Sequence, residues 1–198
     1  MPGRGECIGL FGGTFDPIHV AHLEVAEAVR TALRLDRVLL VVANDPWQKV
    51  DHDITPAEDR YAMVAAAVAG YPGLEASRLE LDRGGPSFTV DTVREIERRH
   101  PGADVVLIVG ADVVEGLPTW KEEPALRELV TLAVVGRPGV GQVEAPPGWR
   151  TVHVPPSSLD VSSSDLRHRL QRGEPVDGVV PDDVIRCIRQ RDLYATGR

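Results

Sequence analysis

This sequence has few cysteines and no excess of positive charge. Only two cysteines, Cys7 and Cys187, occur in 198 residues, and neither lies in a CxxC or Cys/His spacing, so neither a zinc site nor a disulfide framework is expected. We expect two free, buried thiols and a reducing compartment. Lysine and arginine number 22 against 30 aspartates and glutamates, a formal net charge of −8. This balance argues against a non-specific nucleic-acid binder, which needs a basic face, but it permits a small anionic substrate in a local basic pocket.

Long apolar runs are also missing. The longest stretch without charge, about residues 62–74, is too short and too interrupted by glycine and proline to span a bilayer. The first six residues lead straight into a strand and leave no room for a signal peptide. We therefore expect a cytoplasmic protein with no membrane partner. The length predicts a single domain over residues 1–198, with a C-terminal helical portion from about 160 to 198.

Strand-like and helix-like segments alternate along the chain. Short apolar runs bounded by turn residues predict strands at 7–11, 37–43, 74–81, 104–110, 130–135 and 151–154. Helices are predicted from residue 20, over 55–70, over 88–99, in a stretch containing 117–120 and 125–129, and over 164–171 and 182–191. The second helix is expected to open with a capping box at Thr55-Pro-Ala-Glu58. The alternation predicts an α/β fold, a doubly wound, Rossmann-like parallel sheet that binds ligands at the carboxyl ends of its strands.

The stretch GLFGGTFDPIHVAH, residues 9–22, carries the first sign of chemistry. His19 and His22 stand three residues apart where a helical period begins, so they share one face of the first turn. Unpaired amides and the helix dipole favour an anion at that end. Gly12 and Gly13 would let the backbone approach a ligand closely. The stretch therefore predicts a phosphate site with two imidazoles directed at it.

Neither a GxGxxG fingerprint nor a GxxxxGK[ST] loop occurs, which disfavours hydride-transfer enzymes and P-loop kinases. GGTFDPIHVAH instead resembles the (T/H)xGH signature of the nucleotidyltransferase superfamily, and GGTFDPIH is similar to the bacterial nicotinate-nucleotide adenylyltransferases. Later segments resemble further motifs of that family in the same order: RGGPSFTVDTV (83–93), GAD (110–112), LPTWK (117–121), GRPG (136–139), VSSSDLR (161–167) and VPDDVIRCIRQRDLY (180–194).

The resemblance implies transfer of the AMP part of ATP to nicotinate mononucleotide, which yields deamido-NAD and pyrophosphate. The acceptor phosphate is already anionic, so catalysis would rest on positioning and on neutralising charge. Magnesium would be carried on the ATP phosphates, with no metal site of the protein's own. Two alternatives stay open: a sister enzyme that uses nicotinamide mononucleotide, and a non-catalytic nucleotide-binding protein of the same fold. Phosphopantetheine as acceptor is disfavoured by RGGPSFTVDT and LPTW. A homo-oligomer is compatible with the sequence.

The resemblance also implies roles for individual residues. His19 and His22 would be the catalytic pair, and the ATP contacts would be Phe11, Gly12, Gly13, Thr14, Asp112, Ser162, Ser163 and Arg167. Contacts to nicotinate mononucleotide would come from Lys49, Thr89, Trp120 and Arg137. Asp112 would hold the ribose, Trp120 would stack on the nicotinate ring, and Thr89 with neighbouring amides would receive the carboxylate. The alternatives are structural: a turn-forming threonine, a core tryptophan and a serine N-cap.

Two positions depart from the family pattern. The signature normally has glycine where this chain has Ala21, and the loop usually written PPHK reads Pro46-Trp-Gln-Lys49. A methyl group at Ala21 could crowd the ligand, and Gln48 can donate to a phosphate but cannot become cationic. We expect these changes to affect turnover and ATP affinity rather than the identity of the reaction. Asp16, which precedes Pro17, is expected to shape a turn.

Overall fold

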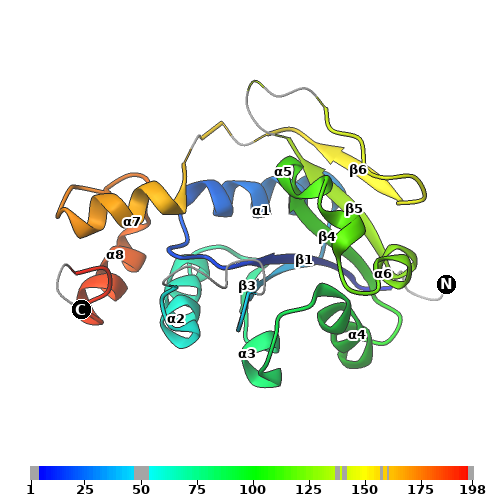
Figure 1. Ribbon diagram of the computed structural model, residues 1–198, viewed down its shortest axis with the longest axis horizontal. Coiled ribbons are helices and arrows are strands. Elements are labelled where there is room, and N and C mark those ends of the chain that lie inside the picture. The colour runs from blue at the N-terminus through cyan, green and yellow to red at the C-terminus, as the bar shows by residue number, and fades with distance from the viewer. Residues whose placement is uncertain are drawn as a thin grey trace.

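The computed structural model describes residues 5–46, 54–136, 139, 142–156, 158–159 and 161–195 (Figure 1). The strands are β1 (Cys7–Gly13), β2 (Arg37–Val42), β3 (Leu74–Ser77), β4 (Asp104–Gly110), β5 (Val130–Val135) and β6 (Thr151–Val154). The helices are α1 (Val20–Leu33), α2 (Ala57–Val68), α3 (Leu79–Arg83), α4 (Thr89–Arg99), α5 (Ala111–Val114), the 3-10 helix η2 (Leu117–Thr119), α6 (Glu123–Leu129), α7 (Ser163–Gln171) and α8 (Asp182–Gln190).

All six strands form one parallel sheet in the order β3-β2-β1-β4-β5-β6. The chain builds outward from β1 to β3 on one side, and then returns to β4 and builds outward to β6 on the other. The order therefore reverses between β1 and β4, where crevices form in doubly wound sheets. The predicted doubly wound, Rossmann-like parallel sheet is confirmed.

Alternate residues of the central strands β1, β2, β4 and β5 enter two separate hydrophobic cores. In β2, Val38 and Leu40 belong to one core, which α1, α2 and α8 complete. Leu39 and Val41 belong to the other, to which α4 and α6 contribute. Strands covered on both faces need apolar residues at successive positions. This requirement explains the continuous apolar runs in the sequence.

Two local predictions were wrong. The third strand ends at Ser77 rather than at residue 81, and Leu79–Arg83 forms α3. Leu79 and Glu80 are buried, and Thr92 of α4 donates to Glu80, so packing against α4 overrides the strand-like alternation. The capping box at Thr55 is also absent: α2 begins after Pro56 without a side-chain cap. The Thr55 amide donates instead to Asp16, 39 residues earlier.

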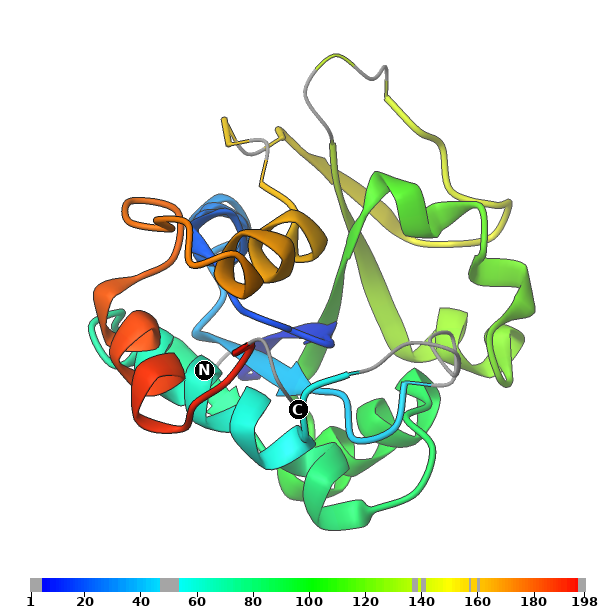
Figure 2. The same cartoon turned by 60° about the vertical axis from the view of Figure 1, so that its left-hand side comes forward.

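The C-terminal helices lie beside the first helices of the chain. Figure 2 shows α7 near α1, with α8 alongside α2. Ser163 of α7 donates to the carbonyl of Pro17, and Arg191 after α8 pairs with Asp59 of α2. These contacts gather α1, α2, α7 and α8 on one face of the sheet. Among the described residues, none of the helices could span a membrane.

Candidate active site

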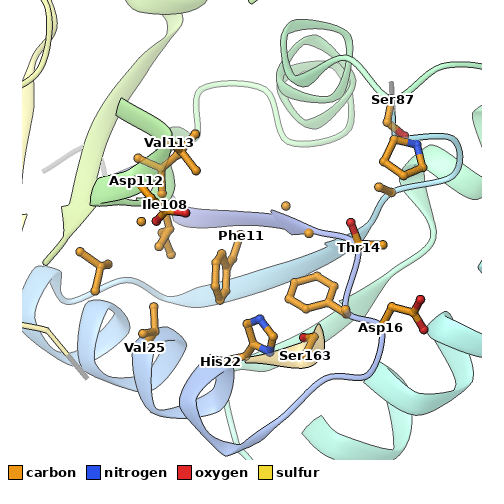
Figure 3. A pocket seen from close by; sticks show the side chains of 18 of the residues that line it. Phe11, Thr14, Asp16, His22, Val25, Ser87, Ile108, Asp112, Val113 and Ser163 are labelled. Atoms are coloured by element: carbon orange, nitrogen blue, oxygen red, sulfur yellow. The ribbon is translucent and has the colours of Figure 1, made fainter. Parts of the chain in front are cut away.

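A cavity of about 1020 Å³ opens at the carboxyl ends of β1 and β4 (Figure 3). Residues from the first turns of α1, α4 and α7 line it. The first amides of a helix lack intrahelical partners, and the helix dipole places partial positive charge at the same end. Three such ends on one cavity favour a ligand with several negative charges.

The cavity has two ends, which we name by their residues. The histidine end comprises residues 12–16, His19, Ala21 and His22 together with Ser162, Ser163 and Arg167. The tryptophan end comprises Thr89, Trp120 and Lys121. The two ends belong to a single cavity, so one ligand or two adjacent ligands can occupy both.

The two glycines after β1 serve different purposes. A Cβ atom on Gly12 would meet nothing within 4 Å, so this position leaves open space beside the cavity. A Cβ atom on Gly13 would lie 2.8 Å from the Phe15 ring. Phe15 is buried and packs edge-on against both Phe11 and His22. Gly12 thus fits the predicted close approach of a ligand, whereas Gly13 is explained by the aromatic packing behind the turn.

His19 and His22 are stacked, with ring centroids 3.7 Å apart. The backbone N–H of His19 donates to Nδ1 of His22 at 3.2 Å. Because Nδ1 accepts, neutral His22 carries its proton on Nε2, which makes that nitrogen a donor. Figure 3 places the His22 ring beside Phe11 and Ser163. The predicted pair on one helical face is therefore present.

His19 is the more deeply buried of the pair, with an exposed fraction of 5%. Burial lowers the pKa of His19 from 6.5 to about 4, because an imidazolium loses its hydration inside the protein. Its Nδ1 has no hydrogen-bond partner among the described residues. His19 is consequently neutral at pH 7 and can hydrogen-bond a ligand without adding a fixed charge.

Residues at the start of α7 line the histidine end of the cavity. Ser162 and Ser163 line the cavity, and Ser163 Oγ donates to the carbonyl of Pro17 at 3.0 Å. Arg167 Nη1 donates to the carbonyl of Asp16 at 2.8 Å. The Ser163 hydroxyl proton is thus engaged within the protein, so an anion would meet the backbone amide of that residue. A guanidinium has five N–H donors, and the bond to Asp16 leaves Arg167 with further capacity.

Asp112 lies just past β4, in the first turn of α5, and lines the cavity, as the sequence predicts (Figure 3). A Cβ atom on Gly110 would lie 2.5 Å from Asp112 Oδ1. Glycine at 110 therefore permits the carboxylate to fold over the strand end.

The sequence is similar to known proteins along most of its length. A family model described as Cytidylyltransferase-like matches residues 10–169. A Thermus thermophilus protein named "Probable nicotinate-nucleotide adenylyltransferase" is 47% identical over 187 residues, which cover 94% of this chain and 98% of that relative. A Corynebacterium kroppenstedtii protein with the same name is 40% identical over 190 residues, which cover 94% and 90% of the two chains. This chain belongs to the nicotinate-nucleotide adenylyltransferase family.

Solved structures confirm the fold of this nicotinate-nucleotide adenylyltransferase family member. A Plasmodium falciparum nicotinic acid mononucleotide adenylyltransferase complexed with NaAD superimposes with a TM-score of 0.78 at 18% identity, and the match covers 96% of this chain and 97% of that one. The same enzyme complexed with APC gives a TM-score of 0.76. At this level of identity, the likeness establishes the architecture alone.

In this family member the tryptophan end is built from α4 and the segment that follows η2. Thr89 is the first residue of α4. Trp120 is half-buried against the second core, and its Nε1 has no hydrogen-bond partner among the described residues. Lys121 lies 4.7 Å above the Phe88 ring and 2.9 Å from the Asp91 carboxylate. Thr89 and Trp120, two of the four side chains that the sequence predicts for substrate contact, thus lie together here, although Trp120 also has a packing role.

Lys49, Arg137 and the unusual Gln48 lie outside the described residues. Ala21 is described: it lines the cavity at the histidine end and has an exposed fraction of 8%. Its methyl group therefore stands where the family's usual glycine would leave more room.

Sequence reasoning missed three residues around the cavity. Phe15 holds the turn, as described above. Ser87 lines the cavity and accepts a hydrogen bond from the Asn44 amide at 2.9 Å. Arg60 is fully buried in α2. The one available signal was periodicity, because Arg60 shares the helical face of Met63, which faces the core.

Proposed function

We propose that this protein transfers the adenylyl group of ATP to nicotinate mononucleotide, giving deamido-NAD and pyrophosphate. One observation carries the proposal: a single cavity joins the stacked histidines and three helix N-termini to a half-buried tryptophan. The histidine end suits a polyphosphate, and the tryptophan end suits an aromatic ring. Family membership supplies the reaction that requires both.

In this reaction a phosphate oxygen of nicotinate mononucleotide attacks the α-phosphorus of ATP. A new oxygen–phosphorus bond forms, and the bond from the α-phosphorus to the bridging oxygen of the β-phosphate breaks. Pyrophosphate leaves with the electron pair. The attacking phosphate is already ionised at neutral pH, so no general base is needed. The protein must hold the two phosphates in line and stabilise the charge on the leaving group.

The histidine end would supply those functions. His22 Nε2 and the Thr14 hydroxyl would donate to the ATP phosphates, together with amides at the starts of α1 and α7. Neutral His19 would hydrogen-bond the same phosphates, and Arg167 would add positive charge. Asp112 would hold the adenosine ribose through its carboxylate. Phe11 would line the nucleotide side of the cavity.

Magnesium would accompany ATP rather than occupy a cage in the protein. The described residues contain no group of three histidine, cysteine or acidic side chains able to hold a metal, whereas Mg²⁺ binds readily through substrate phosphates. When bound, the ion would neutralise charge on the leaving pyrophosphate. The residues of the chain would orient the phosphates that carry it.

The tryptophan end would select the acceptor. The Trp120 ring would stack on the pyridine ring, and the first amides of α4 around Thr89 would donate to the nicotinate carboxylate. Donors at this place favour an acid over an amide. Lys49 and Arg137 are proposed as further contacts to nicotinate mononucleotide on the family pattern. The cytoplasm, where ATP is available, is the proposed location.

A competition assay tests the proposal. The purified protein is given ATP, magnesium and equal amounts of nicotinate mononucleotide, nicotinamide mononucleotide and phosphopantetheine, and the products are identified by mass. We expect deamido-NAD and pyrophosphate to dominate. Dominant NAD would overturn the choice of acceptor, and ATP binding without any product would favour the non-catalytic alternative.

A further inference from the structure

Arg60 stands out as a fully buried cation, with an exposed fraction of 1%. Its guanidinium donates to three backbone carbonyls: Nε to Thr55 at 2.7 Å, Nη1 to Thr14 at 2.9 Å and Nη2 to Asn44 at 3.3 Å. Burial lowers the pKa of Arg60, and the nearby Asp16 carboxylate opposes that shift. Burying a charge is costly unless it is well bonded. The position therefore calls for an explanation beyond packing.

The three carbonyls belong to segments that meet only in the folded protein. Thr14 is part of the turn after β1, and its side chain faces the cavity (Figure 3). Asn44 follows β2, and Thr55 precedes α2. One planar group thus fixes the phosphate-binding turn to both ends of the connection between β2 and α2.

A second set of contacts holds the same turn from the other side. The Asp16 carboxylate accepts from the Tyr194 hydroxyl at 2.6 Å and from the Thr55 amide at 3.2 Å. The Asp16 carbonyl accepts from Arg167. Asp16 is 3% exposed, so this group is largely withdrawn from water. The carbonyls of Thr14 and Asp16 and the Asp16 carboxylate are therefore bonded behind the turn, while the Thr14 hydroxyl remains at the cavity.

We propose that Arg60 is a positioning residue for adenylyl transfer, which it serves by fixing the Thr14 turn in the geometry that receives the ATP phosphates. The inference rests on the proposed function. Arg60 is not itself one of the reacting groups. It acts through the backbone of Thr14, and its three-way contact makes the position of that turn depend on Asn44 and Thr55.

The test replaces Arg60 with lysine, which keeps the charge but cannot reach three diverging carbonyls from one ammonium group. Steady-state kinetics are measured at a temperature where circular dichroism shows the variant fully folded. We expect kcat to fall by about 10- to 100-fold, because small displacements of reacting groups are costly. Should Arg60→Lys fail to fold, Tyr194→Phe, which deletes one oxygen behind the same turn, is expected to lower kcat in the same direction by less.

Two controls separate positioning from stability. Val64→Ala removes buried apolar volume from the same helix, and is expected to lower Tm while leaving kcat and KM unchanged. Arg78→Lys alters a partly exposed arginine that is paired with Glu58 of α2. This change should leave kcat and KM as they are in the wild type. An active wild type with an unchanged kcat in folded Arg60→Lys would overturn this inference alone. A wild type that binds ATP but forms no product would overturn the proposed function and this inference with it.

Discussion

The two ends of the cavity are held in place by different kinds of contact. At the histidine end the restraints are buried: Arg60 donates hydrogen bonds to three carbonyls, and the Asp16 carboxylate accepts one from the Tyr194 hydroxyl. Beside Trp120 they are exposed ion pairs, Lys121 with Asp91 and Arg94 with Glu122, although α4 itself is also fixed by the buried hydrogen bond from Thr92 to Glu80. Exposed pairs contribute about 0–1 kcal/mol each, whereas a buried polar group left without its partner costs about 1–3 kcal/mol.

This contrast suits a reaction with one demanding step. Transfer at the α-phosphorus requires fixed geometry around the ATP phosphates, since electrostatic catalysis depends on preorganised donors. The acceptor must enter and the larger product must leave. Weak, solvent-exposed restraints beside Trp120 would permit that adjustment at little cost. Variants at the two ends test this contrast.

Removal of a donor at the histidine end should have the largest effect. His22→Ala deletes the proposed Nε2 donor and should lower kcat by about 10²- to 10³-fold, as loss of a preorganised donor does elsewhere. The measurement is steady-state turnover of ATP and nicotinate mononucleotide. His168→Ala changes an exposed histidine on α7 and should leave kcat unchanged. Equal kcat values for His22→Ala and the wild type would remove His22 from the mechanism.

The burial of His19 should be visible in stability against pH. Its folded pKa of about 4 lies below the ordinary 6.5, so the unfolded chain takes up the proton first. Stability is therefore lost as the pH falls from about 6.5 towards 4, by about 3 kcal/mol at most. Urea unfolding of the wild type and of His19→Asn should show a steeper loss in the wild type, because carboxylates with lowered pKa values destabilise both proteins as the pH approaches 4. Parallel curves for the two proteins would contradict a buried, neutral His19.

Tyr194→Phe should have a smaller effect, on stability as well as on the turn. Burial and the Asp16 charge raise the pKa of Tyr194 far above its ordinary value, so the hydroxyl stays protonated and donates to Asp16 at 2.6 Å. Its loss should lower the free energy of unfolding by about 1–2 kcal/mol, because Asp16 is left short of one donor. Urea unfolding measures the change. Tyr71→Phe, at an exposed tyrosine, is the control and should have no effect.

The smallest effect is expected at the tryptophan end. Asp91→Asn breaks the ion pair with Lys121 and should cost less than about 1 kcal/mol, with a loss that shrinks as salt is added. A double-mutant cycle with Lys121→Met isolates the pair. If Asp91→Asn costs as much as Tyr194→Phe, the two ends do not differ in the way proposed here.

Local sequence patterns predicted most of the strands and helices. The strands beginning at Arg37, Asp104 and Val130 were found within one residue at each end, because a strand covered on both faces must be apolar throughout. The histidine pair was placed by helical period alone. The strand at Leu74 was extended too far, since Leu79 to Leu81 alternates as a strand does, but its burial against α4 makes it a helix.

The sequence by itself determined the order of the six strands, the motif at the start of α1 and the edge of the sheet where that motif must lie. These follow from short-range periodicity and from the common direction of parallel strands. Only the tertiary structure decided that His19 is neutral, that Gly13 makes room for Phe15 and that Arg60 holds the Thr14 turn. Each of these features depends on burial or on partners distant in the chain. Burial depth and distant partners do not produce a periodic pattern in the sequence.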